Sequence, residues 1–257
     1  MPSVGRWVSK SATAAAIASS LIAAPTPACL SKVAIGAPIA AAASDVKAPE
    51  APPTDAKKLL DKVQARYAKI DGIHARFHQE LTSATLGQTD VADGECWFAK
   101  PGKMRWAYTS PVTQLMVSDG AMLWFYEPDK GQVTKTALDP EMLKQVPTGF
   151  LNGTGSLSEG YRAELPKLEL PPRDGIAVDL TPEKAAPFQK LRVVVEPTTN
   201  LVTEITIFDP FGNVNRLTFT EIEPGKAREA AFFQFTTPEG VREIAPPNPG
   251  GAPTLNP

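Results

Sequence analysis

Residues 93–134 form a series of short strand-like runs rich in aromatic and other large apolar residues, and one of these runs is apolar on both faces. Three of the four tryptophans lie here, and turn signals rich in Gly, Pro and Asp separate the apolar runs. In the run 122–126, Met122 and Trp124 share one face of a strand, whereas Leu123 and Phe125 share the other. Such strands must be covered on both sides, or one side must receive an apolar ligand.

The rest of the central region predicts more strands around this stretch. Asp119-Gly120 indicates a tight hairpin, because a two-residue turn of that hand requires a positive φ. Residues 73–81 alternate between an apolar face, on which Gln79 also falls, and a polar face that carries His74 and His78. Further strand-like runs separated by turn residues occupy 176–180, 191–195, 202–208, 213–222 and 232–236. This succession predicts a large antiparallel sheet.

Two segments have helical character. Residues 55–69 repeat apolar side chains at spacings of three and four, and Thr54 can cap this helix. Residues 139–146 predict a helical turn around Met142 and Leu143, which Pro147 ends. A single sheet with two apolar faces and so few helices can be covered if it curves around a cavity beneath them. Methionines in the lining of such a cavity suit varied acyl chains.

The two ends of the chain do not have the pattern of folded domains. Residues 1–43 have a basic start followed by a short apolar run of small residues, which is typical of a signal peptide. Residues 44–54 form a Pro-rich linker and residues 245–257 a tail, and we expect both to be disordered. The folded domain is therefore expected at 55–244. The formal net charge of −2 gives no indication of a nucleic-acid partner.

Two signal cleavage sites are possible. Ala41-Ala42-Ala43 fits the small-residue rule and predicts cleavage after Ala43, whereas cleavage after Ala28 would make Cys29 the first mature residue. An N-terminal Cys can carry a lipid, although Thr26-Pro27-Ala28 lacks the Leu that usually precedes a lipidated Cys. The sequence thus leaves the site of cleavage and the lipidation of Cys29 open.

No set of residues with a catalytic, cofactor-binding or metal-binding pattern is present. His74 and His78 would be about 13 Å apart on one strand face, too far to share an ion. A secreted lipid hydrolase is a less favoured alternative, because the sequence has no Gly-x-Ser-x-Gly motif to supply a nucleophile. Cys96 lies in an apolar strand and is expected to be a small buried residue.

Several motifs, taken in order, resemble the LolA family of periplasmic carriers of outer-membrane lipoproteins. They are Gly94-Glu95-Cys96-Trp97-Phe98, Lys100-Pro101-Gly102, Val117-Ser118-Asp119-Gly120, Leu123-Trp124 and Phe235-x-x-Pro238-x-Gly240-Val241. The resemblance covers nearly all of residues 55–244. It implies a mainly β fold: an unclosed, strongly curved antiparallel β-barrel of about 11 strands, with helices forming a lid over its concave side.

The resemblance also implies roles for individual residues. It makes Met104, Trp106, Met116 and Trp124 candidates for the lining of the lipid cavity, although each could equally be ordinary core. It makes Phe150 and Leu151 lid residues. Some carriers have Arg where this chain has Lys100, and there the Arg fastens the lid to the barrel through backbone carbonyls. Lys lacks the planar fork of Arg, so residue 100 is either a looser clasp or a solvent-facing Lys.

The function implied by the resemblance is binding and release without chemistry. The expected protein is a periplasmic monomer that takes triacylated lipoproteins from an inner-membrane transporter to an outer-membrane acceptor, with no cofactor. A lipid-anchored receptor of the LolB kind is the alternative from the same fold, and it requires a lipidated Cys29.

We predict that the mature chain begins at Ser44, because Ala41-Ala42-Ala43 provides the better cleavage signal. N-terminal sequencing of the secreted protein measures this directly. A mature chain that begins at Cys29 would contradict the prediction and favour the lipid-anchored receptor.

Overall fold

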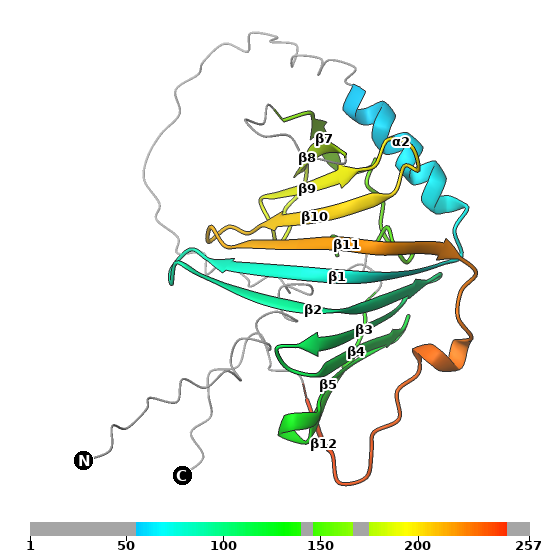
Figure 1. The fold of residues 1–257 in the computed structure, drawn as a ribbon, viewed down its shortest axis with the longest axis vertical. Coiled ribbons are helices and arrows are strands. Elements are labelled where there is room, and N and C mark those ends of the chain that lie inside the picture. Colours follow the sequence, from blue (N-terminus) through cyan, green and yellow to red (C-terminus); the bar gives the residue numbers. More distant parts are fainter. Residues whose placement is uncertain (1–54, 140–145, 167–174, 246–257) are drawn as a thin grey trace, which may run out of the picture.

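The computed structural model describes residues 55–139, 146–166 and 175–245. Within these ranges the chain forms one twelve-stranded sheet, the α-helix α2 and two short 3-10 helices (Figure 1). The predicted signal peptide and linker, residues 140–145 of the predicted helical turn and residues 246–257 of the predicted tail lie outside the described residues.

The sheet is continuous and almost entirely antiparallel. Its strands are β1 (Gly72–Ser83), β2 (Gln88–Ala99), β3 (Lys103–Ser110), β4 (Gln114–Asp119), β5 (Met122–Glu127), β6 (Gln132–Ala137), β7 (Tyr161–Glu164), β8 (Ile176–Pro182), β9 (Lys190–Val195), β10 (Val202–Phe208), β11 (Val214–Gly225) and β12 (Arg242–Ile244). Their order is β12-β6-β5-β4-β3-β2-β1-β11-β10-β9-β8-β7, and only β12 runs parallel to its neighbour, β6. The predicted fold class, an open and curved antiparallel sheet, is confirmed, with twelve strands.

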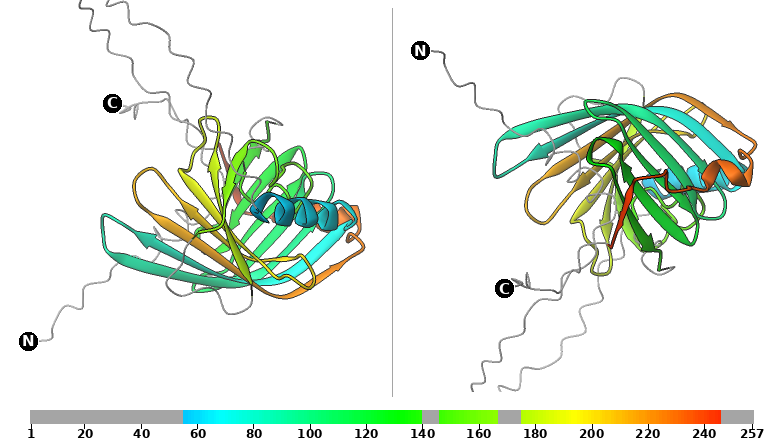
Figure 2. Two further views of the ribbon diagram at one scale, coloured as in Figure 1. Left: turned by 90° about the horizontal axis from the view of Figure 1, so that it is seen from above. Right: turned by 90° about the horizontal axis from the view of Figure 1, so that it is seen from below.

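Helix α2 (Asp55–Ala68) covers part of the concave side of the sheet (Figure 2). Its buried residues Ala56, Leu60, Val63 and Tyr67 are spaced by four, three and four, so they form one stripe that faces the core. All four belong to the same hydrophobic cluster as the inward residues of the sheet. The amphipathic pattern of the sequence therefore positions this helix as a cover.

The register of the sheet fixes which side chains share the concave face. Directly opposed residues on antiparallel strands point to the same side. Trp106 on β3 pairs with Cys96 on β2 and with Met116 on β4, and Met116 pairs with Phe125 on β5. These side chains form one row across the sheet and all pack in or against the core cluster.

The convex face of the sheet has its own cover. The chain after β11 crosses this face, seen from below as the orange-to-red segment of Figure 2. The predicted strand at 232–236 is wrong, because the 3-10 helix η2 (Ala230–Phe233) lies there and packs against β3 and β4. A tight helical turn lets two consecutive phenylalanines both find partners. The Phe232 ring lies 5.2 Å from that of Trp97, and Phe233 is fully buried.

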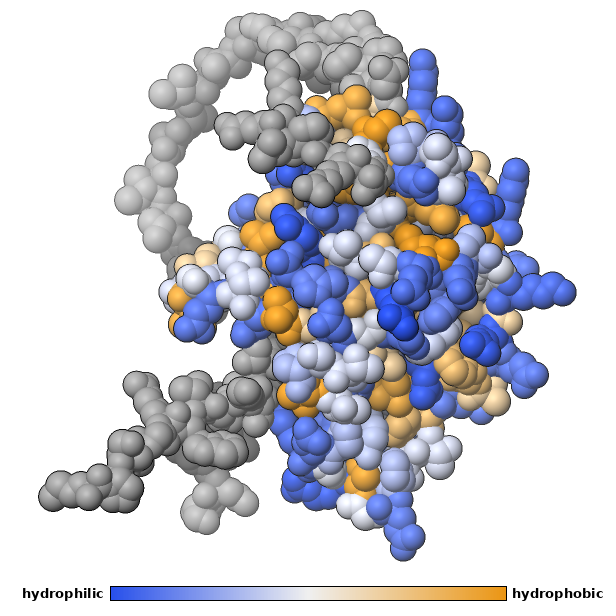
Figure 3. Space-filling model, viewed as in Figure 1, coloured by the Kyte–Doolittle hydropathy of each residue, from blue (hydrophilic) through white to orange (hydrophobic). Residues whose placement is uncertain are grey.

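The outer surface has the mixed character of a protein exposed to water. Hydrophilic residues cover much of the face seen in Figure 3, and hydrophobic ones form smaller areas between them. No helix in the described part of the chain is sufficiently long and apolar to span a membrane. Many of the large apolar side chains are buried, whereas Leu86 and Phe211 are among those exposed.

We predict that Gly94→Ala destabilises the protein by about 1–3 kcal/mol. A Cβ at Gly94 would lie 2.2 Å from the backbone oxygen of Ala107 and 2.8 Å from the Phe77 ring, so the strand itself would have to shift. Gly225→Ala is the control, because a Cβ there meets nothing within 4 Å. Urea denaturation measures both free energies of unfolding, and equal values for the two variants would contradict the prediction.

Candidate functional site: the covered concave face

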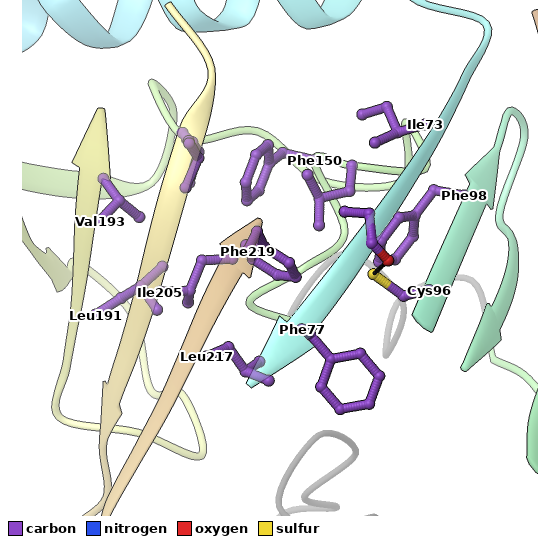
Figure 4. Packing of buried hydrophobic residues seen from close by; sticks show 14 of the residues in the cluster. Ile73, Phe77, Cys96, Phe98, Phe150, Leu191, Val193, Ile205, Leu217 and Phe219 are labelled. Atoms are coloured by element: carbon purple, nitrogen blue, oxygen red, sulfur yellow. Dashed lines mark hydrogen bonds between the residues drawn. The ribbon is translucent and has the colours of Figure 1, made fainter. Parts of the chain in front are cut away.

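An aromatic cluster occupies the middle of the concave face. Trp106 is fully buried, and its ring centroid lies 4.9 Å from that of Phe77, 5.4 Å from Phe98 and 6.4 Å from Phe219. Figure 4 shows Phe77, Phe98, Phe150 and Phe219 in this core together with aliphatic residues from β9, β10 and β11. The interior between sheet and lid is therefore lined almost entirely by apolar side chains from distant parts of the chain.

Three of the four residues proposed for the cavity lining lie together on this face. Met104, Trp106 and Met116 are buried members of the core cluster. Trp124, the fourth residue proposed for the lining, does not lie with them. Its neighbours Leu123 and Phe125 face the core, so Trp124 itself faces the convex side. There it pairs with Val117, which pairs with Arg105, and Arg105 donates to the backbone oxygen of Phe232 in the outer cover.

The loop of residues 146–155 completes the lid beside helix α2. Phe150 and Leu151 are buried, and the Phe150 ring meets the edge of Tyr67 at a centroid distance of 5.1 Å. The Gly102 N–H donates to the backbone oxygen of Asn152 over 3.0 Å, which joins the loop to the β2–β3 turn. We refer below to α2 and this loop together as the lid.

Lys100 connects the sheet to the end of the helix. Its ammonium donates to the backbone oxygens of Tyr67 at 2.6 Å and Ala68 at 3.1 Å, which belong to the last helical turn. Its aliphatic part lies against the loop, because a Cβ on Gly153 would be 3.0 Å from Lys100 Cγ. The side chain thus contacts the sheet turn, the helix and the loop at once.

Tyr67 attaches the same end of the helix to the far half of the sheet. Its hydroxyl accepts a hydrogen bond of 3.1 Å from the Val202 N–H at the start of β10. Burial raises the pKa of Tyr67 to about 12, so the phenol stays neutral at physiological pH. Lys100 therefore joins the end of α2 to the end of β2, and Tyr67 joins it to the start of β10.

A small polar network interrupts the apolar interior. The Tyr108 hydroxyl donates to Gln79 Oε1 at 3.2 Å, and Gln79 Nε2 donates to Asn215 Oδ1 at 2.9 Å. All three side chains are buried. Strand alternation does not predict this network, although it contains one signal: Gln79 falls among the apolar positions of its strand. Only the pairing of β1 with β11 brings Asn215 to it.

The histidines and Cys96 have the locations expected from strand alternation. His74 stacks on Trp97 with ring centroids 4.8 Å apart, and His78 Nδ1 lies 2.7 Å from Asp93 Oδ1, both on the convex side. Cys96 is fully buried on the concave side, and burial raises the pKa of its thiol well above the usual range. Cys96 is therefore an unreactive packing residue.

Sequence comparisons with known proteins assign the chain to a family. The family described as "Outer membrane lipoprotein carrier protein LolA" matches residues 68–236, from the end of α2 to the segment that follows η2. The chain belongs to the LolA family. An outer-membrane lipoprotein carrier protein of Nitrosomonas europaea is 32% identical over 170 residues, which cover 66% of this chain and 81% of the relative.

Other relatives extend the match. The outer-membrane lipoprotein carrier protein of Bordetella pertussis is 31% identical over 196 residues, covering 76% of this chain and 90% of its own length. Among solved structures, a LolA superfamily protein from Nitrosomonas europaea aligns with a TM-score of 0.40 at 14% identity, over 70% of this chain and 97% of the other. The LolA assignment rests on the sequence matches.

We predict that Lys100→Met loosens the junction of lid and sheet. Loss of two charge-assisted hydrogen bonds at a partly exposed position should reduce stability by about 1–2 kcal/mol. Amide hydrogen exchange in the last turn of α2 and in residues 146–155 should become faster. Lys69→Met removes the same charge from an exposed position near the helix end and serves as the control. The same exchange rates in both variants would show that Lys100 does not fasten the lid.

Proposed function

We propose that this protein is a periplasmic carrier that holds the acyl chains of lipoproteins between its curved sheet and its lid. The observation that carries the proposal is an apolar interior, built around Trp106, beneath a lid of one helix and one loop. The names of the relatives, which are outer-membrane lipoprotein carrier proteins, support the same cargo. Transfer by binding and release makes and breaks no covalent bond.

The balance of forces at the lid suits reversible opening. The polar attachments described above join it to the sheet: two bonds from Lys100, one at Tyr67 and one at Gly102. A neutral hydrogen bond contributes about 1 kcal/mol net, and burial of one methylene about 0.8 kcal/mol. Burial of a long acyl chain therefore more than offsets the loss of these four bonds.

The flexible side chains of the interior suit chains of varied length. Met104 lies two residues before Trp106 on β3, and Met116 lies opposite Trp106 on β4. Methionine is unbranched and can adapt to irregular apolar shapes. In this proposal the open lid exposes apolar surface, and the same surface is covered again by acyl chains.

Both membrane partners follow from this cargo. An acyl chain in water is strongly disfavoured, so loading and unloading require direct hand-over. We therefore propose an inner-membrane transporter as donor and an outer-membrane acceptor as recipient, with the carrier acting as a monomer in the periplasm. Acyl labelling distinguishes this carrier from the receptor alternative: label on Cys29 would assign the chain to the lipid-anchored receptor.

The test is mass spectrometry of acylated peptides that co-purify with the protein from periplasmic extract. The wild type should carry lipoproteins that detergent releases, and their absence under expression of a lipoprotein substrate would contradict the proposal.

Leu151→Asp should retain at least fivefold less cargo and raise the fluorescence of an apolar probe, because a buried carboxylate favours the open lid. Leu86→Asp is the control, since Leu86 is 70% exposed. Unaltered cargo and fluorescence in Leu151→Asp would show that residues 146–155 are not part of the lid.

A further inference from the structure

Two hydrogen-bond donors inside the concave core have no partner among the described residues. They are Nε1 of Trp106 and Nδ2 of Asn215, and both atoms are inaccessible to water. Trp106 is fully buried and Asn215 is 4% exposed. Most buried polar groups in proteins are paired, and buried tryptophans usually find an acceptor. Two open donors on one functional face therefore need an explanation.

The surrounding contacts hold the Asn215 donor open. Asn215 Oδ1 accepts from Gln79 Nε2, and the other end of the Gln79 amide accepts from the Tyr108 hydroxyl. In this arrangement both amide oxygens have donors, and Asn215 Nδ2 is left without an acceptor. The Asn215 amide cannot turn its Nδ2 toward a new partner without breaking the bond to Gln79.

The two open donors belong to one continuous set of interior contacts. The rings of Trp106 and Tyr108 both pack edge-on against Phe77, with centroid distances of 4.9 and 5.0 Å. Tyr108 leads through Gln79 to Asn215. Both donors therefore lie on the concave side, one beside Phe77 and the other at the end of the hydrogen-bonded chain that begins at Tyr108.

The environment selects the chemistry of the missing acceptor. Apart from the polar network of Gln79, Tyr108 and Asn215, the core cluster is apolar, and Glu127 is the only charged side chain among the buried polar residues of the described chain. Lys130 and Gln132 already hold the Glu127 carboxylate. An anionic ligand would remain uncompensated here, whereas a neutral carbonyl oxygen can accept a hydrogen bond without bringing a charge.

We infer that Trp106 and Asn215 donate hydrogen bonds to the ester carbonyl oxygens of the bound acyl groups. This inference rests on the proposed function and adds a polar recognition element to an otherwise apolar site. The carrier then distinguishes acyl esters from other apolar chains, such as alkyl ethers, which lack the carbonyl.

A preference for the ester over the ether distinguishes the inference from simple hydrophobic binding. An ester carbonyl is more strongly hydrated than an ether oxygen, so a wholly apolar site favours the ether. A site with open donors favours the ester, because each bond satisfies a group that is otherwise buried and unpaired. One neutral hydrogen bond corresponds to about 2- to 10-fold in affinity.

The experiment compares dioctanoylglycerol with its ether analogue dioctylglycerol, each used to displace a fluorescent apolar probe from the full-length mature protein. Wild type should bind the ester at least about fivefold more tightly than the ether. Trp106→Phe keeps an aromatic ring but removes the N–H, so its ratio of ester to ether affinity should fall clearly below that of the wild type, and an unchanged ratio would overturn the assignment of Trp106 as a donor. Trp97→Phe is a matched control, because Trp97 Nε1 is also buried without a partner but lies on the convex side. It should keep the wild-type preference.

Each outcome decides one question. If wild type binds the ether as tightly as the ester, the inference is overturned while the carrier proposal stands. If Trp97→Phe loses the preference as Trp106→Phe does, the interior N–H is not its source and the inference is again overturned. If neither glyceride displaces the probe, the proposed lipid-binding function itself fails. The wild-type comparison needs no variant, so it remains decisive even if Trp106→Phe is unstable.

Discussion

A curved sheet that is apolar on both faces needs two covers, and the rest of this structure follows from that constraint. Helix α2 and the loop 146–155 cover the concave face, and the segment from η2 to β12 covers the convex face. The two covers differ in kind. The outer one places Phe233 fully buried and continues into β12, which pairs with the sheet edge at β6. The inner one is joined to the sheet by the bonds of Lys100, Tyr67 and Gly102.

This asymmetry is what a carrier requires. A cover that pairs with the sheet as a strand resists removal, because several backbone hydrogen bonds must be lost together. A cover fastened at few points can open when an apolar ligand supplies comparable burial energy. The fastening at Lys100 also shows that a Lys can reach two backbone carbonyls at a helix end without the planar fork of Arg. The sequence alone left the orientation of this side chain open.

Three polar residues form a hydrogen-bonded network inside the apolar site. Gln79, Tyr108 and Asn215 come from three different strands. Their mutual hydrogen bonds leave the amide nitrogen of Asn215 without an acceptor in the core. Periodicity placed Gln79 on the apolar side of its strand, so the sequence marked the position as unusual. It could not reveal Asn215 as the partner, because the two residues are 136 positions apart in the chain.

The sequence by itself determined the elements and the family. The helix at 55–69, the hairpin at Asp119-Gly120, the succession of strands and the order of the motifs all depend on local spacing, which the chain carries directly. The tertiary structure decided which face is which. Trp106 lies on the apolar face of β3, the face opposite to that of Arg105, but Trp124 lies in β5, whose two faces are both apolar, so alternation alone cannot say whether Trp124 points to the lid. That choice depends on where α2 and η2 pack. Such long-range contacts place Trp106 in the concave core and Trp124 on the convex face, and they make a strand-like run at 232–236 into a 3-10 turn.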